Sequence, residues 1–306
     1  MANKLFMTVR LTIILLIIGA AVANAEAQTS TLGVLEDVPG VYFGEPNFRS
    51  VRIVFQTDGN SWRAFRSDCP DQNCLKTITS EYPSDVTWNV TFNGRNLGQI
   101  TGHTPKEFKF YAHVGQQEIV SGGDVPTVGR RSAEFSGFIG HKVYRPLVAN
   151  SQAYFLDPDS WEPSQISTAI GGLLRQEFRR KFPKLCRISK KDETKLEPFL
   201  YRNQDIKLVK AYGSKQGWRL ARLHLEEAVD CKDTEAGFEI DDPWFVVDSR
   251  QLVRYLDSGM WLVDTGDYDN DGRSEVVFSI DRENRGGYKL FYDDFKKRAV
   301  FEFSYH

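Results

Sequence analysis

Alternating apolar and polar residues predict short β-strands along most of this chain. An Asp-Gly pair separates the alternating run 51–56 from the returning run 62–65, and an Asn-Gly pair separates 86–92 from 97–100. Both dipeptides favour the tight turns that join neighbouring antiparallel strands. We therefore expect two β-hairpins within the first hundred or so residues.

Similar patterns recur towards the C-terminus. Further strands are expected at 108–113, 135–143, 206–211, 218–225, 244–247, 288–292 and 300–305. Short strands and tight turns at such intervals are typical of a β-propeller, a sandwich or a barrel. Periodicity alone does not choose among these three, so it predicts a mainly β fold and no more.

One amphipathic helix interrupts the strands. Ser164 can cap its first turn, and Pro183 ends it. The apolar residues between them repeat at three- and four-residue spacing, which places them on one face: Ile166, Ile170, Leu173, Leu174, Phe178 and Phe182. The other face carries Arg175, Arg179, Arg180, Lys181 and Lys184. We interpret it as a solvated basic face, favoured by the helix dipole near the C-terminal end.

The helix also suggests how the chain is organised. It occupies 159–184 and divides a first β region, 26–158, from a second, 185–306. A chain of this length can bury a sizeable core as one or two domains. One continuous domain over 30–306 is therefore the alternative.

Residues 1–25 have the pattern of a secretory signal peptide. Lys4 and Arg10 precede the apolar run 11–23, and Ala23-Asn24-Ala25 offers the small residues of a cleavage site. The apolar run is too short to span a bilayer comfortably, and no later run reaches about 18 apolar residues. We expect a periplasmic or secreted protein with no membrane span after cleavage.

Charge and composition narrow the class of partner. The chain has 39 Lys and Arg against 41 Asp and Glu, and losing Lys4 and Arg10 with the signal peptide leaves a net charge near −4. Such a charge argues against a nucleic-acid binder. Aromatic residues make up 13% of the chain, which favours β structure. The six tryptophans are interpreted as core residues rather than as a stacking surface for sugars or peptides.

Four cysteines in an exported chain predict two disulfides, for which three pairings are possible. Cys69 and Cys74 flank a turn-rich segment whose ends can meet, so we pair them and pair Cys186 with Cys231. A zinc site is the rival interpretation, but the chain has no Cys-x-x-Cys and no histidine at ligand spacing from a cysteine. A redox-active pair at Cys69 and Cys74 is a further alternative, with a spacer unlike the thioredoxin one.

The densest chemistry lies in the run 266–275, Gly-Asp-Tyr-Asp-Asn-Asp-Gly-Arg-Ser-Glu. Asp267, Asp269 and Asp271 alternate and can point their oxygens at one centre, which suits calcium and its roughly six to eight oxygen ligands. The glycine at 272 permits a sharp turn. The carbonyl of Arg273 and the side chain of Glu275 would supply the seventh and ninth positions of the loop. We predict that these five residues hold one calcium ion.

Apolar runs that read as strands flank this loop, at 260–263 before it and 276–278 after it. An EF-hand would need a bidentate Glu where this chain has Phe278. The strand, calcium loop and strand over 260–291 resemble the FG-GAP and VCBS repeats of β-propellers. This resemblance implies a calcium-stabilised β blade and no particular reaction. The chain departs from the repeat in having Glu275 where Asp is usual, and in carrying a single copy.

Motifs for catalysis are absent, including Gly-x-Ser-x-Gly, Gly-x-Gly-x-x-Gly, a phosphate loop and His-Glu-x-x-His. His103, His113 and His141 are interpreted as structural, although each could serve as a general base beside a carboxylate. Asp241 and Asp242 have the composition of a glycosidase site, but neighbouring strand residues point to opposite faces, which favours a simple turn. We therefore predict no catalytic residue.

Together these patterns favour an exported, mainly β protein with a propeller-like architecture of five or six blades, the alternative being two sandwich or barrel domains. We expect it to bind a protein, peptide or glycan outside the cytoplasm. The alternatives are an envelope hydrolase or lyase acting on polysaccharide or cell-wall material, and a structural or assembly factor of the envelope. A deep pocket with two carboxylates about 5–10 Å apart would favour the enzyme. A shallow aromatic groove would favour the binder.

Overall fold

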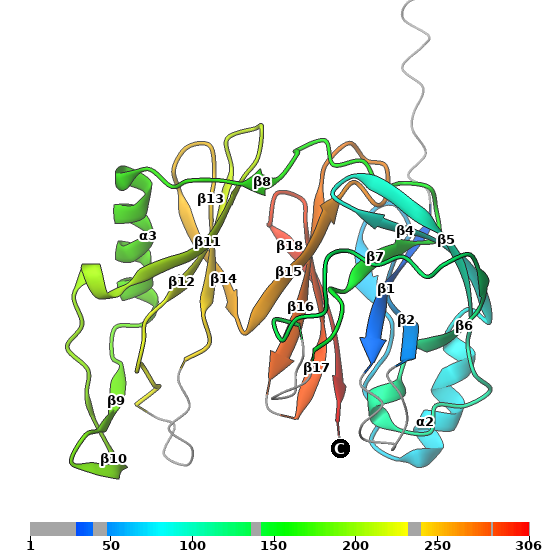
Figure 1. The fold of residues 1–306 in the computed structure, drawn as a ribbon, viewed down its shortest axis with the longest axis horizontal. Coiled ribbons are helices and arrows are strands. Elements are labelled where there is room, and N and C mark those ends of the chain that lie inside the picture. The colour runs from blue at the N-terminus through cyan, green and yellow to red at the C-terminus, as the bar shows by residue number, and fades with distance from the viewer. Residues whose placement is uncertain (1–28, 39–47, 136–141, 232–239, 283, 306) are drawn as a thin grey trace, which may run out of the picture.

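A computed structural model describes residues 29–38, 48–135, 142–231, 240–282 and 284–305. These residues form antiparallel sheets with few helices, stacked along the long axis of the molecule (Figure 1). A barrel from the first half of the chain lies at one end, two further sheets lie in the middle, and helix α3 (Thr168–Lys181) lies at the other end. The prediction of a mainly β fold is confirmed.

Six strands of the first half close into an antiparallel barrel. Their order is β1 (Ser30–Val38), β7 (Leu147–Asn150), β4 (Asp85–Phe92), β5 (Arg95–His103), β6 (Gln116–Gly122) and β2 (Phe48–Thr57), and β1 pairs with β2 to close the ring. The short strand β3 (Trp62–Ala64) returns beside β2, as the first predicted hairpin requires. The helix α2 (Gln72–Ile78) and the 3-10 turns η2 (Thr79–Glu81) and η3 (Tyr111–His113) complete this part.

The barrel interior is built around Trp88, which is fully buried on β4. Its indole N–H donates to the Gln117 side-chain oxygen at 2.8 Å, so the one polar atom of the ring has a partner. Two glycines leave room for the ring. A Cβ on Gly33 would lie 3.2 Å from the ring and 2.6 Å from Val51, and a Cβ on Gly102 would lie 3.0 Å from the indole nitrogen.

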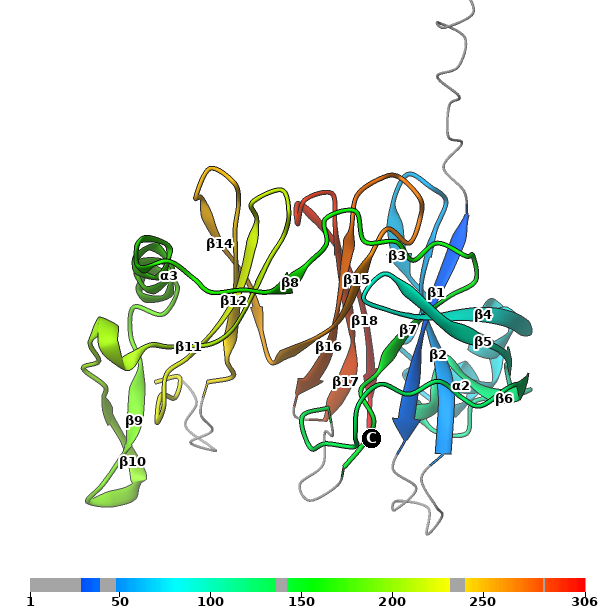
Figure 2. The same cartoon turned by 45° about the horizontal axis from the view of Figure 1, so that its top comes forward.

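Two four-stranded meanders follow the barrel. The first is β11 (Lys207–Gly213), β12 (Arg219–His224), β13 (Pro243–Val247) and β14 (Val253–Ser258), and β8 (Glu162–Pro163) joins it beside β11 to make a five-stranded sheet. The second, the four-stranded sheet, is β15 (Met260–Gly266), β16 (Glu275–Arg282), β17 (Arg285–Tyr292) and β18 (Lys297–Ser304). The hairpin of β9 (Cys186–Ser189) and β10 (Asp192–Pro198) lies at the α3 end, and η4 (Asn203–Asp205) precedes β11 (Figure 2).

The four-stranded sheet contributes one face to each of two hydrophobic cores. Phe278 faces the five-stranded sheet and packs edge-on against Trp244 at 5.2 Å between ring centroids. Its neighbour Val277 faces the barrel and joins the core there. Successive side chains of a strand point to opposite faces of the sheet. Both faces of β16 carry apolar residues because one face packs against the barrel and the other against the five-stranded sheet.

Helix α3 covers the outer face of the five-stranded sheet, where Leu174 and Phe178 are buried. Its cap is Ser167, whose hydroxyl accepts from the Ile170 N–H, and the predicted cap at Ser164 is wrong. The Ser164 N–H donates instead to the carbonyl of Ala211, which holds it beside the sheet.

The expected β-propeller of five or six blades is not found among the described residues. In a propeller every blade is a separate four-stranded sheet around a shared axis. Here the strands of the first half pair with one another in a ring, and only the two meanders of the second half have the size of a blade. The propeller prediction was wrong because hairpin spacing does not reveal that β1 returns to pair with both β2 and β7.

One predicted strand is not observed, and another lies mostly outside the described residues. The strand at 108–113 is wrong: Phe108 is buried edge-on against Tyr82, and a 3-10 turn follows. Most of the strand predicted at 135–143 lies outside the described residues.

The predicted signal peptide, 1–25, also lies outside the described residues. No helix within the described ranges is long and apolar enough to cross a membrane.

Candidate metal centre

The loop between β15 and β16 gathers three carboxylates. Asp267, Asp269 and Glu275 each offer an oxygen, and these oxygens lie within 4.8 Å of one another. The three residues are only 9%, 7% and 2% exposed, respectively. Three of the ligands predicted from the sequence are therefore brought together in the structure.

The loop takes its shape from hydrogen bonds to Asp267 and from two left-handed residues. The Asp267 carboxylate accepts from the backbone N–H groups of Asp271 and Gly272, both at 2.9 Å. Asn270 and Gly272 have φ of 63° and 86°, a region that Asn and Gly enter with the least strain. The turn expected at Gly272 is present.

The carboxylates of this group repel one another. Burial, with the charges of Asp271 and Asp267, raises the pKa of Asp269 to about 6. Burial and then the Asp269 charge raise the pKa of Glu275 well above its ordinary value. The oxygen Asp269 Oδ1 is buried without a hydrogen-bond partner. Since buried anions are stable together only when protons or a cation neutralise them, this group can hold a metal ion.

The chemistry of the donors fits a hard cation. The group offers carboxylate oxygens and neither imidazole nor thiolate, which suits calcium or magnesium rather than zinc or copper. Calcium takes roughly six to eight oxygens, so the three side chains would need further ligands. Asp271 and the Arg273 carbonyl stay the predicted sources of two of those oxygens.

Asp271 is held at the edge of this group by Arg273. Its Oδ2 accepts from the Arg273 guanidinium at 2.7 Å, and its Oδ1 accepts from the Arg273 backbone N–H at 2.9 Å. The same guanidinium reaches Asp293, in the β17–β18 turn, also at 2.7 Å. Arg273 therefore joins the loop to the neighbouring turn, a role that its sequence position did not reveal.

Asp157 ties the loop to the segment that leaves the barrel. Its carboxylate accepts from the Ser274 hydroxyl at one oxygen and from the Trp161 N–H at the other. Sequence reasoning missed Asp157 because it stands 117 residues before Ser274, and its only local signal is the turn-forming run Asp-Pro-Asp-Ser.

The loop also reaches into the barrel through Tyr268, whose ring is fully buried in the barrel core. Its carbonyl accepts from the Asn150 side chain on β7 at 3.0 Å. Nearby, Asp264 is 3% exposed and accepts from the Asn93 N–H at the β4–β5 turn at 3.0 Å. Burial raises the pKa of Asp264 to about 6. The β15–β16 loop thus lies where the four-stranded sheet meets the barrel.

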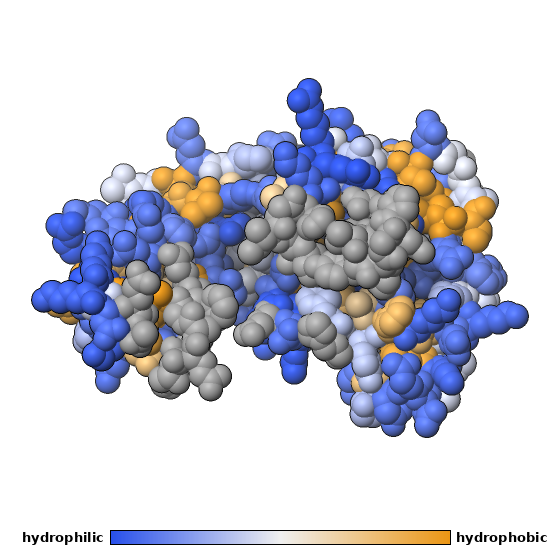
Figure 3. Space-filling view, turned by 60° about the horizontal axis from the view of Figure 1, so that its bottom comes forward, coloured by the Kyte–Doolittle hydropathy of each residue, from blue (hydrophilic) through white to orange (hydrophobic). Residues whose placement is uncertain are grey.

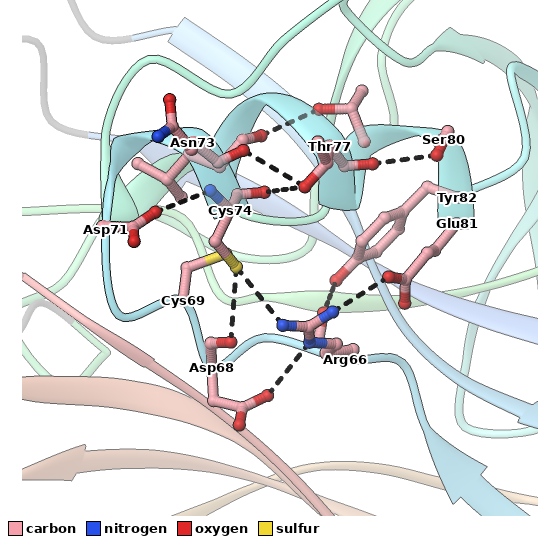
Figure 4. The surroundings of a disulfide bond; sticks show 12 residues. Arg66, Asp68, Cys69, Asp71, Asn73, Cys74, Thr77, Ser80, Glu81 and Tyr82 are labelled. Carbon is pink, nitrogen blue, oxygen red and sulfur yellow. Dashed lines mark hydrogen bonds and ion pairs between the residues drawn. A yellow bond between two sulfur atoms is a disulfide. The ribbon is translucent and has the colours of Figure 1, made fainter.

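Both predicted disulfides are present in the structure, as Cys69–Cys74 and Cys186–Cys231. The first closes the entry to α2, where the Asp71 side chain accepts from the Cys74 N–H at 2.9 Å (Figure 4). Arg66 lies beside it, 3.4 Å from Cys74 Sγ. The second joins the first residue of β9 to Cys231, two residues after Val229, which forms an isolated antiparallel β-bridge with Cys186.

Among the described residues, the other sequence candidates do not join this group of carboxylates. His103 pairs with Asp85 at 2.7 Å on the surface, and His141 lies outside the described residues. Asp242 binds Arg222 and His224, at 2.9 and 2.7 Å, so it is part of an ion-pair group.

Comparison with known proteins gives no relative. No family model matches the chain, and neither a curated protein nor a solved structure is significantly similar to it. The resemblance of the loop to FG-GAP and VCBS repeats therefore stays a prediction.

Proposed function

We propose that this protein is an exported binding protein whose β scaffold is stabilised by one calcium ion in the β15–β16 loop. The observation that carries the proposal is the buried, unpartnered Asp269 Oδ1 beside Asp267 and Glu275. An oxygen without a hydrogen-bond donor among other carboxylates is stabilised by a cation more than by any other ligand. The resemblance to an FG-GAP or VCBS loop supports the same assignment.

The position of the loop supports a structural role for the ion. Its residues contact the barrel through Tyr268 and the connecting segment through Asp157. An ion there would fix the barrel against the sheets, as a scaffold requires. The two disulfides support an extracytoplasmic location, because such bonds persist in oxidising compartments.

Two hollows of the described surface bear on the choice between binding and hydrolysis. They have volumes of about 200 and 270 Å³ and are lined without any Asp or Glu, so neither has the carboxylate pair that a hydrolase of the type considered above needs. Apolar side chains are exposed on the barrel, among them Phe110 and Val120, which are 51% and 57% exposed. On the face in Figure 3, apolar patches stand among mainly hydrophilic residues.

The test is capture of a ligand from an envelope extract by the immobilised mature protein, in millimolar calcium and in chelator. We expect a protein, peptide or glycan that binds saturably when it is purified and added back. The Asp269→Ala variant is the matched bait, and it should retain less ligand in calcium. Turnover of cell-wall polysaccharide by the wild type, or no saturable ligand in either condition, would contradict the proposal.

A further inference from the structure

A hollow of about 200 Å³ opens between β14 and the β17–β18 turn. Four cations line it, and the rings of Phe291 and Phe295 lie beside them. The cations are Arg254, Lys296, Lys297 and Arg298, all exposed, and none of the lining residues is acidic. Lys296 and Lys297 are paired with Asp293 and Asp294 at 3.3 to 3.7 Å, so the two arginines carry most of the charge that attracts an anion with an apolar neighbour. The hollow is smaller than the roughly 300–1,000 Å³ of a drug-sized site, so it suits a single group of a larger ligand.

Arg254 is held in place rather than free in solvent. Its guanidinium donates to the carbonyl oxygens of Asp294 and Phe295, at 2.9 and 3.2 Å. Arg298 is exposed and makes no ion pair within the described part of the chain, which leaves its charge for a ligand. One fixed and one uncompensated guanidinium form a partly preorganised pair of donors for a carboxylate.

The turn that carries these carbonyls is strained. Asp293, Asp294 and Phe295 all have positive φ, at 51°, 54° and 60°, and a bulky residue rarely adopts this conformation. Phe295 is kept there by rings, since its centroid lies 5.8 Å from both Trp161 and Trp218. Strain of this kind is common at ligand clamps, and here it directs two carbonyls at Arg254.

The hollow is connected to the metal loop by two successive ion pairs. Arg273 of the loop binds Asp293 at 2.7 Å. Asp293 in turn lies 3.7 Å from Lys296 and 3.5 Å from Lys297, both of which line the hollow. A change at the loop therefore has a short path to the hollow.

We propose that this hollow binds a side-chain carboxylate of an extended, acidic segment of a partner protein, and that calcium in the loop strengthens this binding. The inference rests on the proposed function and names the partner class. An extended peptide is favoured because β14, which supplies Arg254, pairs with β13 alone among the described strands. Its other edge can therefore pair with an added strand while the hollow takes an acidic side chain.

The sign of the calcium effect follows from two contributions. Without the ion, the loop carboxylates repel an acidic ligand and one another, and with it their charge is largely neutralised. The ion also fixes the loop that positions Arg273, and with it Asp293 and the turn. Coupling between two sites is reciprocal, so the peptide should tighten calcium binding by the same factor. We expect that factor to be about fivefold or more, as in typical coupled sites.

The experiment measures fluorescence anisotropy of a labelled hexaglutamate peptide at low ionic strength, in millimolar calcium and in chelator. Arg298→Gln should weaken binding about threefold or more, in the range of one lost ion pair. Lys106→Gln, which removes an exposed cation on the barrel side, is the matched control and should change nothing. Asp293→Asn should keep the binding and reduce its calcium dependence. Melting curves of all variants establish that they are folded.

Each outcome decides the inference. Equal affinity of wild type and Arg298→Gln for the peptide, or no binding by either, would overturn it. Binding of an oligogalacturonate in place of hexaglutamate would show that the partner is an acidic glycan and overturn the peptide class. If the ligand captured from the envelope binds Arg298→Gln as well as the wild type, this inference fails while the proposed function stands.

Discussion

The backbone N–H of Asp267 donates to the carbonyl of Leu156 at 2.7 Å. The first residue of the β15–β16 loop is thereby fastened to the segment that runs from the barrel to the second half of the chain. Asp157, the next residue, binds Ser274 at the far end of the same loop. Both ends of the loop are therefore fastened to one short segment.

Calcium should raise the melting temperature of the wild type by a few degrees, and Asp269→Ala should abolish that shift. Extracellular calcium modules bind at about 10⁻⁴ to 10⁻³ M, so roughly millimolar calcium adds only about 0.4 to 1.4 kcal/mol. Without calcium the variant should melt at the same temperature or slightly higher, because it loses one repelling charge. Calorimetry with and without chelator measures both effects.

The control for this experiment is Asp68→Ala, whose side chain is 94% exposed and far from the loop in sequence. It should respond to calcium as the wild type does. An undiminished calcium response in Asp269→Ala would place the ion elsewhere.

Asp264→Asn should stabilise the calcium-free protein at pH 7.5 and have no effect near pH 4. Burial raises the Asp264 pKa from 3.8 to about 6, so the folded state binds the proton more tightly than the unfolded state. Stability therefore falls as pH rises from about 4 to about 6, by on the order of 2–3 kcal/mol, and stays lower above that window. Asparagine removes the buried charge and keeps an oxygen for the Asn93 N–H. Urea unfolding between pH 4 and 8 measures the difference in unfolding free energy between Asp264→Asn and the wild type. A variant that is less stable than the wild type at pH 7.5 would show that the buried Asp264 charge does not destabilise the protein.

The two disulfides should contribute unequally. Replacing Cys186 or Cys231 with Ser should cost roughly 2–5 kcal/mol, with about 4 expected for a loop of 45 residues in the chain-entropy account, whereas the five-residue separation of Cys69 and Cys74 gives about 2. Denaturant unfolding of the single variants measures the costs. Peptide mapping without reduction establishes the pairing, and four free thiols in protein from an oxidising compartment would contradict it.

Gly33→Ala should destabilise the barrel by about 1–3 kcal/mol. Its Cβ would lie 2.6 Å from Val51 Cγ1 and 3.2 Å from the Trp88 ring, and a filled core resists added atoms. Gly123→Ala is the matched control, because its Cβ would meet nothing within 4 Å. Urea unfolding followed by tryptophan fluorescence compares the two, and equal stability would show that the ring has room to move.

The sequence was informative wherever a feature depends on neighbouring residues. The hairpins at 51–65 and 86–100, the helix and the β15–β16 loop were all located from local spacing. The barrel was not, because the pairing of β1 with β7 joins Leu32 to Asn150, and alternation along a strand does not identify its partner. Helix α2 was missed because it is only seven residues long and has two buried residues.

The residues of the candidate site also fall into those that local spacing reveals and those that only the fold brings together. The carboxylates at 267, 269 and 275 were found from their spacing, since one loop carries them all. Asp157, Asp264 and Asp293 were missed, because each contacts the loop or its neighbours through the folded arrangement of distant strands. The link from Arg273 to Asp293 spans 20 residues, and no local pattern encodes it.

The barrel core includes residues of β18, which lies far along the chain from the strands of the barrel. Phe301 and Phe303 of β18 belong to its core, the Arg52 guanidinium lies 3.9 Å from the centroid of the Phe303 ring, and the Tyr288 hydroxyl donates to Glu36 at 2.7 Å. Contacts between such distant residues form slowly, because the chain between them must first be ordered. During folding, the apolar flank of the barrel therefore stays exposed to solvent until β17 and β18 pack against it.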